Sequence, residues 1–200
     1  MPDSFEEILD FWFGDFSVPD YPPRERSQLW FGKSESDDRL IRERFSATLE
    51  RAARGEYDGW KSDPRGRLAL ILVFDQFPRN IYRDTPRAFA FDPKAQALAT
   101  EGIEQGSDTA LNPFDRVFFY LPLEHAEDPQ LQRKSVERYR RLIEEAPPEL
   151  LAKLSGYLDY AVRHAQVIER FGRFPHRNRI LGRVSTPQET EYLKEPGSSF

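Results

Sequence analysis

The sequence contains no cysteine among its 200 residues. Disulfide bonds, thiolate ligands for metal ions and cysteine nucleophiles are therefore excluded. Motifs of other enzyme classes are missing too, because neither a G-x-S-x-G nucleophile elbow nor a G-x-G-x-x-G dinucleotide-binding loop occurs. Gly32-Lys33-Ser34 lacks the earlier glycine of a phosphate-binding loop. The sequence thus gives no support to serine-hydrolase or dinucleotide-dependent chemistry.

Long apolar runs are also absent. The longest, Leu68 to Phe74, is far shorter than the roughly 20 residues that cross a bilayer as a helix. The N-terminal segment is acidic, with Asp3, Glu6 and Glu7, where a secretory or organellar signal would be basic. We therefore expect a cytoplasmic protein without a membrane partner.

The charge distribution favours a different kind of partner. A net charge of −5 and a pI near 5.4 argue against general affinity for nucleic acid or anionic membranes. Residues 164–183, however, are rich in arginine and contain Glu169 as their only acid. These arginines are Arg170, Arg173, Arg177, Arg179 and Arg183. The segment favours a small anionic molecule, while a protein partner or a homo-oligomer stays open.

Composition and proline placement predict an all-α fold. Phe and Leu, rather than Val and Ile, dominate the apolar residues, which disfavours strands. Several of the 16 prolines follow a helix-capping side chain and would be the first residue of a helix, where a missing N–H costs nothing. These pairs are Asp63-Pro64, Thr85-Pro86, Asp92-Pro93, Asn112-Pro113 and Thr186-Pro187. Ser4 with Glu7, and Thr186 with Glu189, predict capping boxes. We expect about eight to ten helices in one domain over residues 1–200, with a core over about residues 4–194 and a short flexible C-terminal tail.

Three ionisable residues continue apolar helical stripes. Asp75 ends the apolar helix expected from Pro64 to about Gln76, and His164 continues a stripe in the helix expected from Pro148. His125 follows Pro122, which should kink or break its helix just before the histidine. We expect all three side chains to face the interior.

Two segments repeat one pattern. In residues 74–83 and 171–183 a Phe-x-x-Phe-Pro unit is followed by an Arg-Asn pair. Arginine presents a fixed fork of donors that matches carboxylate and phosphate, and asparagine both donates and accepts. The pattern predicts ligand-binding roles for Arg79, Asn80, Arg83, Arg173, Arg177 and Asn178. We add His164, which lies on the helix that leads into the second copy.

Several interpretations stay open. One is a pocket for a small anion. A second is an enzyme in which His125 or His176 is the general acid or base, oriented by Asp75 or Glu127. A third is a helical groove for a peptide. Against all three stands a purely structural role, in which Asp75 pairs with nearby arginines and His164 is a hydrogen-bonded core residue. We predict no cofactor and no metal, because the histidine and carboxylate spacings match no ligand motif.

The motifs taken together resemble a known family. They are Asp75-Gln76-Phe77-Pro78-Arg79-Asn80 with Tyr82-Arg83, Leu121-Pro122 with His125 and Glu127-Asp128, Phe171-Gly172-Arg173-Phe174-Pro175-His176-Arg177-Asn178, and Phe11-Trp12-Phe13-Gly14. On these residues the chain resembles the bacterial domain of unknown function 924. The resemblance implies a helical, tetratricopeptide-like right-handed α-α superhelix or bundle and no particular activity, although the chain shows no regular period of about 34 residues. Glu124 departs from the family pattern, which favours an apolar residue there.

Overall fold

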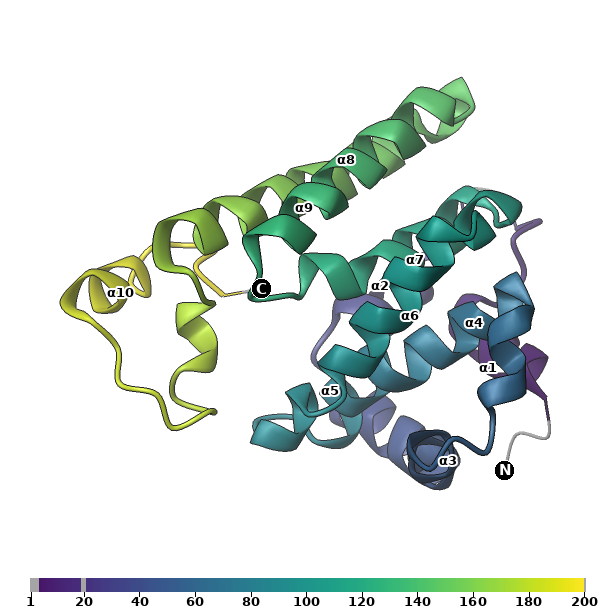
Figure 1. Cartoon of the computed structure of the whole chain (residues 1–200), viewed down its shortest axis with the longest axis horizontal. Coiled ribbons are helices and arrows are strands. Elements are labelled where there is room, and N and C mark those ends of the chain that lie inside the picture. The colour runs from purple at the N-terminus through teal and green to yellow at the C-terminus, as the bar shows by residue number, and fades with distance from the viewer. Residues whose placement is uncertain (1–3, 19–20, 200) are drawn as a thin grey trace. The chain divides into compact units, whose positions relative to one another are not determined.

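The computed structural model describes residues 4–18 and 21–199 (Figure 1). Within these ranges the chain forms ten α-helices and no strand, so the predicted all-α class is confirmed. In the same ranges, no helix combines the length and apolarity needed to cross a membrane. The tetratricopeptide-like superhelix stays a prediction.

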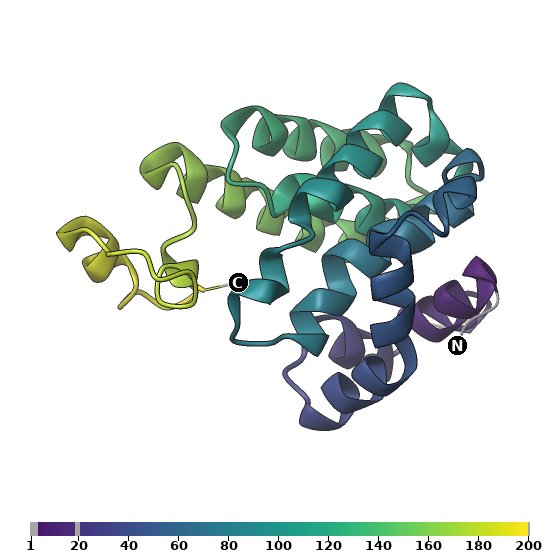
Figure 2. The same cartoon turned by 60° about the horizontal axis from the view of Figure 1, so that its bottom comes forward.

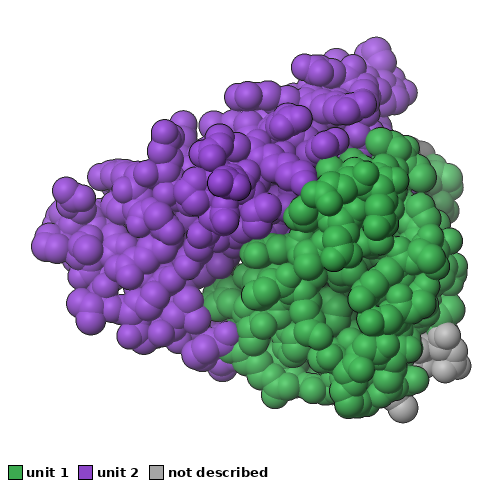
Figure 3. Space-filling model, in the orientation of Figure 1, with its two compact units in different colours: residues 1–83, 87–111 green, residues 84–86, 112–200 purple. Residues whose placement is uncertain are grey.

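The chain divides into two compact units, coloured separately in Figure 3. Unit 1 comprises residues 1–83 and 87–111, and unit 2 comprises residues 84–86 and 112–200. Single-turn 3₁₀ segments connect the helices at Asp58–Ser62, Pro86–Phe89, Ser107–Ala110, Pro148–Leu150 and Pro175–Arg177. The prediction of a single domain stays a prediction.

Unit 1 is built around an apolar central helix. Its helices are α1 (Phe5–Phe13), α2 (Arg24–Phe31), α3 (Glu35–Ala53), α4 (Pro64–Ile71), α5 (Phe77–Ile81) and α6 (Asp92–Glu104). Helix α4 packs against both α1 and α6, and its residues from Gly66 onward are buried. Aromatic side chains close the core beside it, since Phe77 stacks on Phe45 with ring centroids 4.6 Å apart. The central position predicted for this helix is therefore confirmed.

A π-helical turn, Leu72–Gln76, joins α4 to α5. Here the N–H of Phe77 donates to the carbonyl of Leu72, five residues back. Pro78 follows immediately; it has no N–H to donate and would crowd the carbonyl of Phe74 in a regular α-helix. The wider turn relieves this conflict and keeps the chain helical. Asp75 lies within it and is 0% exposed.

Unit 2 is a three-helix core with a C-terminal extension. Its helices are α7 (Pro113–Glu124), α8 (Pro129–Glu145), α9 (Leu151–Phe171) and α10 (Pro187–Tyr192). Helix α8 packs against both α7 and α9, and the two views show α8 and α9 side by side along their length (Figure 1, Figure 2). The hydroxyl of Tyr139 on α8 donates to the carbonyl of Val117 on α7 at 3.0 Å, which fixes the two helices in register.

The predicted helix starts are mostly observed. Asp63 and Asn112 each accept two backbone N–H groups at the starts of α4 and α7, and Thr186 with Glu189 forms the predicted capping box. The box predicted for Ser4 is wrong, because its side chain makes no capping hydrogen bond. Asp92 is the first residue of α6 rather than its cap, and its carboxylate binds an arginine instead.

Pro122 lies inside α7, which continues through it and ends at Glu124. The predicted break just before His125 is therefore observed at the end of α7. His125 is the C-cap residue, and its N–H still donates to the carbonyl of Leu121.

Candidate functional site

Asp75 in unit 1 is bound by its neighbours on the same helical segment. Its carboxylate accepts a hydrogen bond from Gln76 Nε2 at 2.6 Å and lies 3.4 Å from Arg79 Nη1. Arg79 also donates two hydrogen bonds to the Asp92 carboxylate, at 2.9 and 3.2 Å. Burial alone would lower the pKa of Arg79, but Asp75 and Asp92 raise it above the ordinary value because they stabilise the charged guanidinium. The three residues form an internal charge network.

Asn80 and Arg83 converge on a carboxylate of α3. Arg83 contacts both oxygens of Asp38, with Nη2 at 2.6 Å from Oδ1, and Asn80 Nδ2 donates to the same oxygen at 2.9 Å. Burial raises the pKa of Asp38, but the hydrogen bonds from Arg83 and Asn80 outweigh it and leave the pKa below the ordinary value. The polar side chains of the first copy of the repeated pattern thus bind carboxylates of the same unit.

Arg173 and Asn178 in unit 2 bind Glu189 of α10. Arg173 reaches both carboxylate oxygens at 2.6 and 2.8 Å, and Asn178 Nδ2 donates to Glu189 Oε2 at 3.3 Å and to Ser185 Oγ at 3.0 Å. Glu189 is buried. The hydrogen bonds from Arg173 are the main reason that its pKa falls to about 2. These contacts hold α10 to the segment that follows α9.

Arg183 and Glu127 form a second anchor for the same segment. Arg183 binds both oxygens of Glu127 at 2.6 and 2.9 Å, and the N–H of Phe174 donates to Glu127 Oε1 at 2.7 Å. Arg183 was not among the predicted site residues. The sequence did indicate that these two segments could pair, because residues 124–128 contain acids without lysine or arginine and residues 164–183 contain arginines in excess.

The three histidines gather in unit 2 around one phenylalanine ring. The His164 and His176 rings lie 5.5 and 5.6 Å from the Phe174 ring, and the His125 ring lies 6.3 Å from that of His164. The Arg177 guanidinium stands 4.5 Å above the Phe174 centroid. We call His125, His164, Phe174, His176 and Arg177 the histidine cluster. Phe174 is fully buried, whereas His125 and His176 are partly exposed.

Two of these histidines are held neutral. Burial, followed by the nearby Arg177 charge, lowers the pKa of His176 to about 4. Burial also lowers the pKa of His164 to about 3, although its hydrogen bond to Tyr160 acts in the opposite direction. Arg177 and His125 contribute to both decreases. After burial, the charge of Arg177 is thus one cause of the lowered pKa of both imidazoles.

Glu124 is a neighbour of His164 that the sequence interpretation omitted, because the family pattern favours an apolar residue there. Its Oε1 lies 3.1 Å from His164 Nδ1, which is also 2.8 Å from the carbonyl oxygen of Tyr160. Both Glu124 and His164 are buried. Burial, and then Glu124, raise the pKa of Tyr139 well above its ordinary value. His164 thus matches the core alternative, a buried and hydrogen-bonded imidazole.

Asp75 lies in unit 1 and the histidine cluster in unit 2, so their convergence on one site stays a prediction. Among the residues described, no group of three or more His, Asp or Glu side chains is arranged to hold a metal ion. Surface hollows of about 490 and 280 Å³ lie elsewhere, along α9 and beside the end of α1. None of the predicted site residues lines either hollow.

Comparison with known proteins gives two matches. The sequence model of the family described as "Bacterial protein of unknown function (DUF924)" matches residues 8–197. A solved structure, that of the protein of unknown function ATU0120 from Agrobacterium tumefaciens, is similar with 40% sequence identity and a TM-score of 0.79, over 95% of this chain and 96% of that one. No protein with curated annotation matches.

Proposed function

Because the chain belongs to the bacterial family DUF924, whose description states no activity, we propose a function from its own residues: unit 2 binds a small anionic molecule at the histidine cluster. One observation carries the proposal. Arg177 contributes positive potential at the imidazoles of His164 and His176, both of which are held neutral mainly by burial. An anion would be favoured by this potential.

Two carboxylates lie near the cluster, and one of them, Glu124, has its Oε1 3.1 Å from His164 Nδ1. Glu127 is the carboxylate whose charge opposes Arg177 at His176, and Arg183 binds both of its oxygens. Arg177 has a planar guanidinium suited to carboxylate or phosphate, and it is 6% exposed and packed over the Phe174 ring. The partly exposed His125 and His176 offer further polar contacts at the surface.

The other predicted ligand-binding residues receive structural roles in this proposal. Arg79, Arg83 and Arg173 hold Asp92, Asp38 and Glu189 respectively, each through two hydrogen bonds. A ligand would have to displace a buried carboxylate to reach any of them, which would leave that charge unpaired. We assign anion recognition to Arg177, whose charge acts on the imidazoles of His164 and His176, and to His176 itself.

One observation favours an enzyme as the second candidate. With a pKa of about 4, His176 has an unprotonated imidazole at neutral pH that could accept a proton. The carboxylates expected to orient a histidine are engaged elsewhere, since Asp75 binds Gln76 and Arg79, and Glu127 binds Arg183. The geometry supports binding better than general base catalysis.

Thermal unfolding with phosphate, sulfate, citrate and nucleotides tests the proposal. A ligand present at a hundredfold excess over its Kd adds roughly 2.7 kcal/mol, which for a chain of this size raises Tm by about 5–10 °C. Arg177→Ala should abolish the increase. The matched control is Arg179→Ala, because Arg179 lies two residues away on the same segment and is exposed.

Two results would contradict the proposal. One is that no anion in the panel raises Tm. The other is that Arg177→Ala and Arg179→Ala respond equally to the best anion. Circular dichroism of Arg177→Ala without ligand checks that the helices are intact, so that a lost response reports lost binding.

A further inference from the structure

The histidine cluster contains all three histidines of the chain. Histidine is the side chain whose ordinary pKa lies between pH 5 and pH 8, and the chain has no cysteine. The side chains that ordinarily titrate near neutral pH are therefore gathered at the site proposed for an anion. Proton binding and anion binding meet at one place.

His176 is the histidine best placed to respond to a bound anion. It directly precedes Arg177, and both side chains contact Phe174, with the His176 ring 5.6 Å and the guanidinium 4.5 Å from the phenyl ring. His176 is partly exposed, whereas His164 is only 4% exposed. An anion held by Arg177 would therefore lie beside the imidazole of His176.

Charged and titratable groups face His176 from each neighbouring segment. They are Arg177 and Arg183 of its own segment, Glu127 of the turn before α8, His125 at the end of α7 and His164 of α9. Burial, and then Arg177, lower the pKa of His176 to about 4, while Glu127 acts in the opposite direction. Arg183 binds both oxygens of Glu127. The imidazole of His176 is therefore neutral at pH 7 while no anion is bound.

An anion beside Arg177 would reverse this balance. Its charge offsets that of the guanidinium, which is one cause of the lowered pKa of His176. A neutral imidazole has one N–H donor and one acceptor nitrogen, whereas a protonated imidazole has two donors. Hydrogen bonds between charged partners are also the stronger ones. A nearby opposite charge typically moves a pKa by roughly 1–3 pH units toward the charged form.

We propose that the anion site is regulated by pH, because His176 takes up a proton when an anion binds beside Arg177. This inference rests on the proposed function and adds the regulation of the same site. By linkage, an anion whose binding brings a proton binds more tightly as the pH falls. With a pKa of about 4 in the free protein and a rise of roughly two pH units in the complex, the Kd should fall about tenfold from pH 7 to pH 5.

Sulfate is the probe, because its charge does not change between pH 5 and pH 8 and any pH dependence then belongs to the protein. Isothermal titration calorimetry at constant ionic strength gives the Kd at pH 7 and at pH 5. At pH 6, titrations in two buffers with different heats of ionisation give the number of protons taken up. We expect a Kd about tenfold lower at pH 5 and an uptake of roughly half a proton at pH 6. Circular dichroism at each pH checks that the helices are intact.

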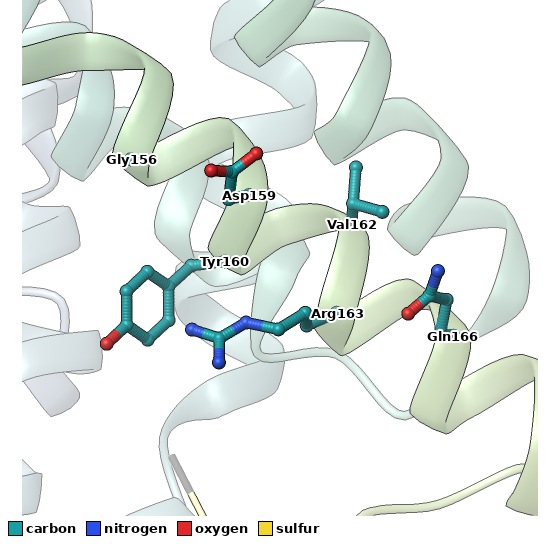
Figure 4. A pocket seen from close by; sticks show the side chains of 6 residues that line it. All are labelled: Gly156, Asp159, Tyr160, Val162, Arg163 and Gln166. Atoms are coloured by element: carbon teal, nitrogen blue, oxygen red, sulfur yellow. The ribbon is translucent and has the colours of Figure 1, made fainter. Parts of the chain in front are cut away.

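Two variants and one control identify the source of the pH dependence. Arg177→Ala should abolish sulfate binding. His176→Gln keeps a hydrogen-bonding side chain that does not titrate, so its sulfate Kd should be nearly equal at the two pH values, without proton uptake. Arg163→Ala is the control, because Arg163 is one of six residues that line the larger hollow, along α9, and none of the six is a histidine (Figure 4). It should leave both the Kd and the proton uptake unchanged.

The results distinguish a failure of the regulation from a failure of the site. Sulfate binding that needs Arg177 but shows equal Kd values and no proton uptake overturns the regulation and leaves the anion site in place. Sulfate binding at neither pH contradicts the proposed function, and the regulation fails with it. A pH dependence that persists in His176→Gln reflects the less negative net charge of the whole chain at pH 5 and overturns the role of His176. Binding lost in Arg163→Ala instead places the anion on α9.

Discussion

Acidification from pH 7 to pH 5 should destabilise the protein through His164. The ordinary histidine pKa is 6.5, and burial lowers that of His164 to about 3 in the folded chain. Between these values the unfolded chain binds a proton that the folded chain does not, so the free energy of unfolding falls as the pH falls. From pH 7 to pH 5 the linkage relation gives a loss of about 2 kcal/mol for this residue.

His176 adds to the same loss. Its pKa of about 4 gives up to about 2 kcal/mol more over this interval. Acids contribute little there, because the lowered pKa values of Glu127 and Glu189 start from an ordinary value of 4.5 and their stabilisation is lost mainly below pH 5. Between pH 7 and pH 5 the change in the free energy of unfolding therefore reports mainly on these two histidines, and together they should lower it by up to about 4 kcal/mol.

Urea unfolding at the two pH values, at constant ionic strength, measures the loss. His164→Asn removes the titration while its amide can still donate to the Tyr160 carbonyl, which His164 Nδ1 contacts at 2.8 Å. The pH-dependent loss should then shrink by about 2 kcal/mol. His176→Asn should likewise remove the contribution of His176 to the pH-dependent loss of unfolding free energy.

The opposite sign would refute this reasoning. If His164 were protonated in the folded protein and ion-paired with Glu124, 3.1 Å away, its folded pKa would be raised rather than lowered. Stability would then increase as the pH falls toward 5, and His164→Asn would remove that increase. A wild-type free energy of unfolding at pH 5 equal to or above that at pH 7 identifies this case.

Two further predictions concern stability and use the same urea assay. Gly66→Ala should lower the free energy of unfolding by about 1–3 kcal/mol, because a Cβ would lie 2.5 Å from the carbonyl oxygen of Trp60. Gly156→Ala has open space around it and should raise the free energy of unfolding by roughly 0.5–1 kcal/mol through helix propensity. Equal effects of the two substitutions would contradict the packing at Gly66. Glu189→Gln should lose about 1–2 kcal/mol, since it removes the charge that binds the partly exposed Arg173 while the amide oxygen can still accept a hydrogen bond. The exposed Glu191→Gln should stay within about 0.5 kcal/mol, and a similar loss in both variants would contradict the difference in their burial.

The helix starts could be predicted because their chemistry is local. Asp63, Asn112 and Thr186 accept N–H groups two or three residues along the chain, so the interaction is visible in a short stretch of sequence. Ser4 shows the limit of this reasoning. A side chain of the right type stands at the right position there but makes no capping hydrogen bond.

The partners of the arginines could not be predicted, because they are remote in the sequence. Asp38 precedes Arg83 by 45 residues, and Glu127 precedes Arg183 by 56. The repeated pattern correctly indicated donors that need acceptors. Only the tertiary structure shows that the acceptors of Arg79, Arg83 and Arg173 belong to the protein itself.

The π turn at Leu72–Gln76 makes the segment from α4 to α5 equivalent to a regular helix with one residue inserted. Each α-helical residue advances the direction of the side chain by about 100°, so the insertion shifts the phase of every side chain after it by about that angle. Deleting one residue within the turn would therefore redirect Arg79 and Asn80 together, and it would restore the conflict between Pro78 and the carbonyl four residues before it. The side chains of α4 and α5 are thus out of phase by about the rotation of one residue, and their relative directions depend on the number of residues in the turn.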